Sequence, residues 1–328
     1  MKAIQMDAPG GPEVLRLVER PTPSPGPGEV LVRIHAIGVA YPDTLVRNGT
    51  HLWMPKMPYV PGNEASGTVV NANGSTRLRE GQPVFFTSWD IGFAGGLYAE
   101  YAVLRDTAPW PLPDHVDLDM AASLFNYLVG WILIRQGARG AEFGTVLLHG
   151  AAGGMGTALA ELARLEGATV IGSVGSDDKA GFIRGRGVTH ALNYNTAPLV
   201  GQVNEVTGGR GADISFNHIG GDSLLDDLQM VAPLGLIVSY AALAGTPSRD
   251  LFAAMRGVIG RSPAVRVIAT HVYQNTPILQ AACAKAIELL AEGSIAPAIT
   301  ARLPLAEAAH AHRLLEERGS IGKILLKP

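Results

Sequence analysis

One stretch of the sequence, TVLLHGAAGGMGTALAELARLEG at residues 145–167, constrains the fold more than any other. A short apolar run, typical of a buried parallel strand, leads into a glycine-rich loop, and a segment with helical spacing of apolar residues follows. Glycine allows a tight turn and lets the backbone approach a pyrophosphate, whose charge is stabilised at a helix N-terminus. The stretch therefore predicts a dinucleotide-binding unit, in which the cofactor contacts Ala152, Gly153, Gly154, Met155 and Gly156.

The chain has two regions with different sequence patterns, and its 328 residues are enough for two domains. From about residue 123 to residue 270, strand-like runs such as ATVIGSVG and GLIVSYAAL alternate with helical segments, which predicts a doubly wound parallel sheet. Residues 1–122 instead contain short β-type runs separated by Pro and Gly, such as EVLVRIHAIGV and QPVFF. These runs predict an antiparallel, barrel-like domain.

The end of the strand ATVIGSVG predicts which dinucleotide binds. NAD sites place an acid there to hold the ribose 2′-hydroxyl. Here the strand ends in small neutral residues, no acid precedes Asp177 and Asp178, and Lys179 follows. The two aspartates suit a helix cap, and a lysine beside a neutral strand end suits a 2′-phosphate. We therefore expect NADPH rather than NADH.

Composition excludes several other classes of protein. The net charge is −3 without a basic block, so nucleic acid and anionic membranes are not expected partners. The N-terminus lacks a signal-peptide core, and no apolar run is long enough to cross a bilayer. The single cysteine, Cys283, excludes an internal disulfide and any multi-cysteine metal site. These features predict a soluble, cytoplasmic protein.

A series of motifs then follows one family's order: GGPEVLRL, PGPGEVLVRI, PYVPGNEASG, HGAAGGMGTALAELARLEGATVIGSV, GGRGADISFNHIGGD and IGKILL. Essentially end to end, the chain resembles the zinc-free quinone oxidoreductase branch of the medium-chain dehydrogenase/reductase superfamily. The resemblance implies an α/β protein with a GroES-like β-barrel catalytic domain at residues 1–122 and 271–328. It also implies a doubly wound Rossmann NADP-binding domain at residues 123–270, and a cleft between the two for nicotinamide and substrate.

The resemblance carries site residues position by position. Lys179 and Tyr194 match positions that hold the adenosine 2′-phosphate, and Ser176 matches a nearby hydroxyl. The other expected cofactor-binding residues are Asn217, Leu243 and Lys323. A homodimer is also implied, with the strand AVRVIAT of each copy pairing edge to edge.

The positions that hold zinc in other members of the superfamily have no suitable ligands here. A cysteine is replaced by Ala40, a histidine by Asn63, and the stretch around Asn126 has no cysteine. Zinc needs about three protein ligands with N, S or O donors. We therefore expect no metal, which disfavours a zinc alcohol dehydrogenase.

Without a Lewis acid, the acceptor must already be electron-poor. Hydride addition to an enone or quinone gives an anion that needs only hydrogen-bond donors. The candidate catalytic donors are Tyr41, Asn63 and Asn126, with water supplying the final proton. Asp43 matches a family aspartate, and both a capping or packing role and a substrate role stay open for it.

The leading interpretation is an NADPH-dependent reductase that transfers hydride to quinones or other α,β-unsaturated carbonyls. One alternative is an enoyl-thioester reductase, although the sequence shows no basic cluster for a thioester carrier. The alternative from another class is a non-catalytic NADPH-binding protein with a structural or regulatory role.

Overall fold

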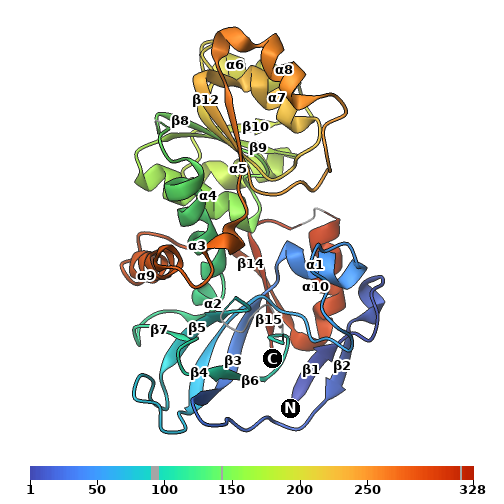
Figure 1. The fold of residues 1–328 in the computed structure, drawn as a ribbon, viewed down its shortest axis with the longest axis vertical. Helices are drawn as coiled ribbons and strands as arrows, with labels where there is room; N and C mark the ends of the chain where they lie inside the picture. The colour runs from blue at the N-terminus through green and yellow to red at the C-terminus, as the bar shows by residue number, and fades with distance from the viewer. Residues whose placement is uncertain (90–95, 142, 318–319) are drawn as a thin grey trace. The chain divides into compact units, whose positions relative to one another are not determined.

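The computed structural model describes residues 1–89, 96–141, 143–317 and 320–328. Its contacts divide the chain into two compact units, the first made of Met1–Phe125 with Cys283–Pro328 and the second of Asn126–Ala282 (Figure 1). The sequence placed the boundaries earlier, at 122/123 and 270/271. The difference arises because two helices, α3 (Leu124–Ile132) and α9 (Pro277–Ala291), span the boundaries, so no loop marks them.

Both ends of the chain build the first unit. Its helices are α1 (Tyr41–Asn48), α2 (Leu118–Ala121) and α10 (Ala308–Glu316). Its strands are β1 (Lys2–Gln5), β2 (Arg16–Glu19), β3 (Glu29–Gly38), β4 (Glu64–Asn71), β5 (Pro83–Thr87), β6 (Tyr101–Arg105), β7 (Trp110–Pro111), β14 (Ile299–Pro304) and β15 (Lys323–Lys327). The larger sheet has the order β14-β15-β3-β4-β5-β7, and β6 also pairs with β3. Strand β15 from the chain end thus lies antiparallel beside β3 from the beginning.

Alternation of apolar residues explains the sheet of the first unit. In β3, Val32, Ile34 and Ala36 point inward and are buried, while Arg33 and His35 between them are exposed. This period of two is the pattern of a strand with one buried face. Val32 and Ile34 join one core with apolar residues of β1, β4, β15 and α10.

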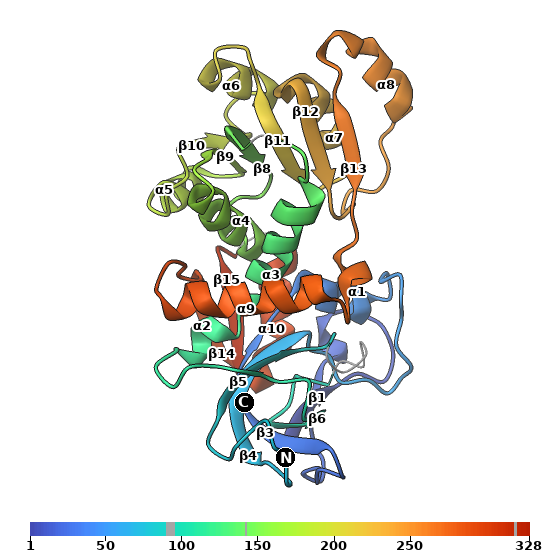
Figure 2. The ribbon, with the colours of Figure 1, turned by 60° about the vertical axis from the view of Figure 1, so that its left-hand side comes forward.

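The second unit is built on a six-stranded parallel sheet with the order β10-β9-β8-β11-β12-β13 (Figure 2). The strands are β8 (Thr145–Leu148), β9 (Thr169–Val174), β10 (His190–Asn193), β11 (Ala212–Asn217), β12 (Val231–Ser239) and β13 (Ala264–Val267). Between them lie α4 (Gly154–Leu165), α5 (Asp177–Arg184), α6 (Leu199–Val206), α7 (Ser223–Met230) and α8 (Leu251–Gly257).

The strand order reverses direction between β8 and β11. Right-handed crossovers then place α4 and α5 on one face of the sheet and the later helices on the other. Loops at the carboxyl ends of β8 and β11 diverge there, which is where open α/β sheets bind ligands. The expected α/β class, with a doubly wound sheet and a second β-rich unit, is confirmed. Among the described residues, no helix is long and apolar enough to cross a membrane.

Candidate active site

The glycine loop connects the end of β8 to the start of α4. Gly150 has a φ of +59°, a backbone conformation that L side chains rarely adopt. A Cβ at Gly156 would lie 2.4 Å from the Gly150 carbonyl oxygen, so only glycine lets the helix pack this closely on the loop. The first N–H groups of α4 have no carbonyl one turn earlier to bond, because the helix begins at Gly154. Residues 152–156 therefore lie at a helix N-terminus whose first N–H groups point toward an anion, and their contact with a pyrophosphate stays a prediction.

The three residues expected at the 2′-phosphate follow the ends of two neighbouring strands. Ser176 follows β9, and its Oγ accepts a hydrogen bond of 3.3 Å from the Lys179 backbone N–H. Tyr194 follows β10, which pairs with β9, and a Cβ on Gly175 would lie 2.6 Å from the Tyr194 hydroxyl. Half-buried Lys179 stands one turn into α5, and Tyr194 is 42% exposed. The fold thus brings two hydroxyls and an ammonium-bearing helix turn to one edge of the sheet.

The acid nearest this edge already has a hydrogen-bond partner. Asp177 accepts a hydrogen bond of 2.8 Å from the Asn193 side-chain amide. Asp177 and Asp178 both stand in the first turn of α5, where acids are stabilised by the helix dipole. The cap itself is Ser176, whereas the sequence suggested the two aspartates for that role, and they instead add negative charge in the turn after the cap.

Asn217, an expected cofactor residue, is fully buried at the carboxyl end of β11. Its amide oxygen accepts hydrogen bonds from the backbone N–H groups of Ile219, at 2.8 Å, and Gly220, at 3.0 Å. Its Nδ2 donates to Ser223 Oγ at 3.0 Å and to Asp227 Oδ2 at 2.7 Å. Asn217 therefore fixes the turn after β11, and these contacts use both ends of its amide.

Asp227, on α7, is a residue that the sequence reasoning missed. It is fully buried and also accepts hydrogen bonds from His149 Nε2, at 2.8 Å, and Ser215 Oγ, at 3.0 Å. Burial alone would lower the pKa of His149, but the Asp227 carboxylate outweighs it and raises that pKa. The only sequence signal was an acid on the buried face of an amphipathic helix, and nothing local linked it to His149.

His218 lies over the glycine loop. A Cβ on Gly150 would lie 2.8 Å from His218 Cε1. Burial and the nearby His149 lower the pKa of His218 to about 4, so the ring is neutral at pH 7. The His218 carbonyl accepts a hydrogen bond of 3.3 Å from the N–H of Leu243, whose side chain is 43% exposed. Leu243, an expected cofactor-binding residue, is thus hydrogen-bonded to the loop after β11.

In the first unit, Tyr41 is the first residue of α1 and is 39% exposed. Within the described residues its hydroxyl has no hydrogen-bond partner, so the phenol is available to a ligand. Asn63 is half-buried just before β4, and its Nδ2 donates to Asp43 Oδ1 at 2.6 Å. Its Oδ1 accepts a hydrogen bond of 2.7 Å from Ser88 Oγ. Asn63 is therefore held at both ends and keeps one N–H free of these two contacts.

Asn126, the third candidate donor, belongs to the second unit and is half-buried on α3. Its neighbour Tyr127 is buried and donates a hydrogen bond of 2.8 Å to Glu161 Oε2 on α4. Tyr127 therefore packs inside its own unit. A joint role of Asn126 with Tyr41 and Asn63 stays a prediction.

Lys323 begins β15, and the structure places its ammonium on Glu64, the first residue of β4. The lysine side chain is 5% exposed and the glutamate is fully buried. Glu64 Oε2 also accepts a hydrogen bond of 3.2 Å from the Phe125 N–H. Burial raises the pKa of Glu64, and the Lys323 charge opposes that shift. The sequence predicted Lys323 as a cofactor residue, whereas the contact seen for its ammonium is this internal ion pair.

Among the described residues, no three His, Cys, Asp or Glu side chains come together in a way that could hold a metal ion. The side-chain amide of Asn63 is hydrogen-bonded to Asp43 and Ser88, and Ala40 has no side-chain atom that could bind a metal.

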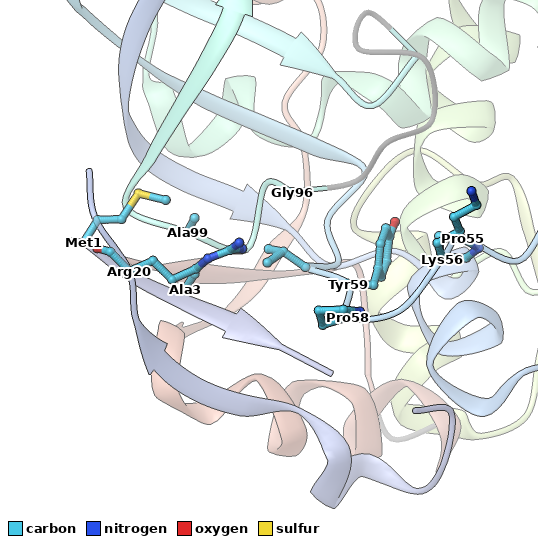
Figure 3. Close-up of a pocket in the computed structure, with 10 residues that line it drawn as sticks. Met1, Ala3, Arg20, Pro55, Lys56, Pro58, Tyr59, Gly96 and Ala99 are labelled. Carbon is cyan, nitrogen blue, oxygen red and sulfur yellow. Dashed lines mark hydrogen bonds between the residues drawn. The ribbon is translucent and has the colours of Figure 1, made fainter. Parts of the chain in front are cut away.

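A hollow of about 490 Å³ lies in the first unit beside the segment that leads to Asn63 (Figure 3). Its lining residues are Met1, Ala3, Arg20, Pro55, Lys56, Pro58, Tyr59, Val60, Gly96 and Ala99. In Figure 3 the cations Arg20 and Lys56 stand apart, with the Tyr59 ring between them. Neither Tyr41 nor Asn63 is among these lining residues, so the hollow is separate from the expected catalytic donors.

Comparisons with known proteins agree with this architecture. Residues 26–114 match the alcohol dehydrogenase GroES-like domain, and residues 186–326 match the zinc-binding dehydrogenase family model. Quinone oxidoreductase from Pseudomonas aeruginosa is 34% identical, over 100% of this chain and 99% of that protein. A 2-haloacrylate reductase from a Burkholderia species is 31% identical, over 97% of this chain and 96% of that protein.

Among solved structures, the Escherichia coli quinone oxidoreductase complexed with NADPH has a TM-score of 0.89 and 29% identity, with 100% of each chain covered. The end-to-end match covers both units. The chain therefore belongs to the quinone oxidoreductase branch of the medium-chain dehydrogenase/reductase superfamily.

Proposed function

We propose that this protein is a zinc-independent, NADPH-dependent reductase that transfers hydride to quinones or other α,β-unsaturated carbonyls. The observation that carries the proposal is the edge formed by Ser176, Lys179 and Tyr194 beside the glycine loop. The side chains there are two hydroxyls and a lysine, and the carboxylate of Asp177 accepts a hydrogen bond from Asn193. Such an edge favours a 2′-phosphate over a free ribose hydroxyl. The likeness to an oxidoreductase solved with NADPH supports the same cofactor.

The residues divide the work between the two units. When bound, NADPH supplies the hydride. Residues 152–156 bind the pyrophosphate through the N-terminus of α4, while Lys179 and Tyr194 hold the 2′-phosphate. In the first unit, the Tyr41 hydroxyl and the remaining Asn63 N–H donate hydrogen bonds to the oxygen that becomes anionic. Asn126 adds a third donor, and water returns the proton.

An electron-poor acceptor follows from the absence of zinc-binding side chains at 40 and 63. A saturated ketone needs a Lewis acid to become a good hydride acceptor, whereas an enone or a quinone does not. The similarity to a 2-haloacrylate reductase supports an activated carbon–carbon double bond as one form of the acceptor. The purified protein should hold no stoichiometric zinc and stay active in chelator.

The test is NADPH oxidation with a small acceptor panel at fixed protein concentration. The panel contains a benzoquinone, a cyclic enone, a 2-haloacrylate, a crotonyl thioester and a saturated ketone. We expect turnover with the first two and no measurable turnover with the saturated ketone. Fastest turnover of the thioester would favour the enoyl-thioester reductase. NADPH binding without turnover of any acceptor would favour a non-catalytic role.

We also propose a homodimer that pairs through β13. This strand is at the edge of the six-stranded sheet, and Val267 on it is 81% exposed. An exposed apolar edge strand is normally covered by another chain. A charged substitution, Val267→Lys, should shift the mass seen by light scattering from dimer to monomer, and a monomeric parent protein would refute the proposal. A cytoplasmic location stays a prediction.

A further inference from the structure

A buried carboxylate, Asp43, lies directly behind the expected catalytic donors of the first unit. It is 1% exposed and accepts hydrogen bonds at both oxygens. Oδ1 receives the Asn63 Nδ2, at 2.6 Å, and the Gly62 N–H, at 3.3 Å. Oδ2 receives the Ala40 N–H, at 3.0 Å, and the Tyr98 hydroxyl, at 3.3 Å. Four donors converge on one side chain, and an ionised carboxylate is the form that can accept all four.

The proton arrangement around the ionised carboxylate is determined by this set of contacts. Tyr98 gives its one hydrogen to Asp43, so His312 Nε2, 3.1 Å away, must donate to the Tyr98 oxygen. Nδ1 of His312 is then an unprotonated lone pair, and it is buried without a partner in the described part of the chain. Burial, with Arg47 nearby, lowers the pKa of His312 to about 3, which agrees with a neutral ring.

A proton on Asp43 breaks this arrangement. The protonated acid must donate, but the two backbone amides and the Asn63 amide present only N–H groups to it. The Tyr98 oxygen alone can accept, and Tyr98 must then donate to His312 Nε2. The ring proton moves to the partnerless Nδ1, and a buried N–H without an acceptor is costly. A neutral carboxyl is also a weaker acceptor for Asn63 than a carboxylate.

The same carboxylate fixes the two groups that would touch the substrate. It holds the Asn63 amide in one orientation, with Nδ2 toward Asp43 and Oδ1 toward Ser88. It also bonds the N–H of Ala40, the residue that caps α1, so it determines where Tyr41 begins that helix. Removal of the negative charge therefore loosens both donors together.

We propose that Asp43 is the positioning residue of this site, whose ionised carboxylate orients Asn63 and the Tyr41 turn for the transfer of hydride. The inference rests on the proposed reductase function and adds a pH dependence to it. Asp43 touches neither substrate nor cofactor in this account, and acts only through Asn63 and the first turn of α1.

Several charged and titratable groups face this cluster. Burial raises the pKa of Asp43 to about 6, while the Ala40 N–H and the Lys323 charge oppose the shift and Glu64 adds to it. Tyr59 lies close enough for the Asp43 charge to raise its pKa further above the value set by burial. The carboxylate is therefore expected to lose its charge as pH falls through about 6, and the donors to lose their positioning with it.

The first experiment compares pH profiles of kcat/KM for enone reduction in the parent protein, Asp43→Asn, Asn63→Ala and the double variant. We expect an acid limb near pH 6 in the parent. Each single variant should lose up to roughly 100-fold at pH 8, the lower end of the roughly 10²- to 10³-fold loss for removal of one oxyanion donor, because other donors remain. The acid limb should vanish in Asp43→Asn and shrink in Asn63→Ala, in which only the Tyr41 turn still depends on the carboxylate. The double variant should lose no more than the worse single variant. Asp114→Asn, an exposed aspartate of the same unit, is the matched control and should keep the parent profile.

Tyr98→Phe protects the test against a folding failure of Asp43→Asn. It removes one hydrogen bond to the ionised carboxylate and leaves the Asn63 contacts in place. The acid limb should then move up by roughly half a unit to one unit. An unshifted limb, or additive losses in the double variant, would overturn the positioning role.

A readout without substrate separates this inference from the proposed function. In protein labelled with ¹⁵N at asparagine, the side-chain amide signal that disappears in Asn63→Ala should titrate with a midpoint near pH 6. It should not titrate in Asp43→Asn. If the Asn63 signal titrates but the protein reduces no acceptor, the contact between Asp43 and Asn63 is supported and the reductase function is refuted. If the protein is a reductase but the Asn63 signal does not change with pH, the positioning role of Asp43 is refuted.

Discussion

The ion pair between Glu64 and Lys323 offers the sharpest stability test. We consider Lys323→Met, which removes the ammonium and keeps a side chain of similar length. Glu64 would then be a fully buried carboxylate with one remaining donor, the Phe125 N–H at 3.2 Å. Breaking a buried pair by removing one partner costs roughly 3–5 kcal/mol because the other charge is left uncompensated. We expect the free energy of unfolding of the first unit to fall by that amount at pH 8.

The sign of the pH dependence follows from the raised pKa of Glu64. Burial already raises this pKa with Lys323 present, and loss of the lysine charge raises it further. A carboxyl with a raised folded-state pKa binds its proton more tightly in the folded protein. The variant is therefore most stable relative to the parent below about pH 4, the unfolded value, and loses stability as pH rises through the folded value.

The assay is urea unfolding at pH 5 and pH 8, followed by tryptophan fluorescence. Trp53, Trp89 and Trp110 lie in the first unit and Trp131 in the second, so the signal mainly reports the first unit. The double variant Glu64→Gln with Lys323→Met should regain most of the loss, because no buried charge remains. A loss below about 1 kcal/mol at both pH values would refute the reasoning. Weaker NADPH binding at unchanged stability would instead support the cofactor role that the sequence predicted for Lys323.

Three further outcomes are expected. Lys179→Ala should weaken NADPH binding by about 10- to 150-fold and barely change NADH binding, because a charge-assisted hydrogen bond is worth roughly 1.5–3 kcal/mol; calorimetry with both cofactors checks this, and equal losses would contradict it. Gly156→Ala should lower the free energy of unfolding by roughly 1–3 kcal/mol and weaken cofactor binding, because the new Cβ would lie 2.4 Å from the Gly150 carbonyl oxygen. Gly153→Ala, whose Cβ would lie 3.5 Å from the same oxygen, should have a smaller effect on both unfolding and cofactor binding. Tyr41→Phe should lower kcat/KM for enones by roughly 10-fold, or about 1.4 kcal/mol, without abolishing turnover; a complete loss would make Tyr41 an obligate acid.

Features that depend on neighbours in the chain could be predicted from the sequence. The glycine loop is one example, because its strand, turn and helix N-terminus are consecutive and each follows from local backbone chemistry. The strand end at Ser176 and the turn that contains Lys179 are another. The α/β class and the role of both chain ends in one unit followed from the order of motifs that the chain shares with its family.

Other features depend on residues that only the folded chain brings together. Glu64 and Lys323 are 259 positions apart and meet because β15 and β4 both pair with β3. Tyr98 and His312 are 214 positions apart. No local pattern distinguished Asp43 as the acceptor of four hydrogen bonds from an ordinary helix cap.

The sequence by itself thus determined the elements, the cofactor loop and the family. Hydrophobic period, glycine and capping residues act within a few positions of the chain, so they can be interpreted without a fold. Tertiary structure alone decided which buried charges are paired and therefore what Asn63, Asn217 and Lys323 contact. The physical reason is that a buried polar group must find its partner in space, and sheet pairing, rather than sequence distance, decides which partner it finds.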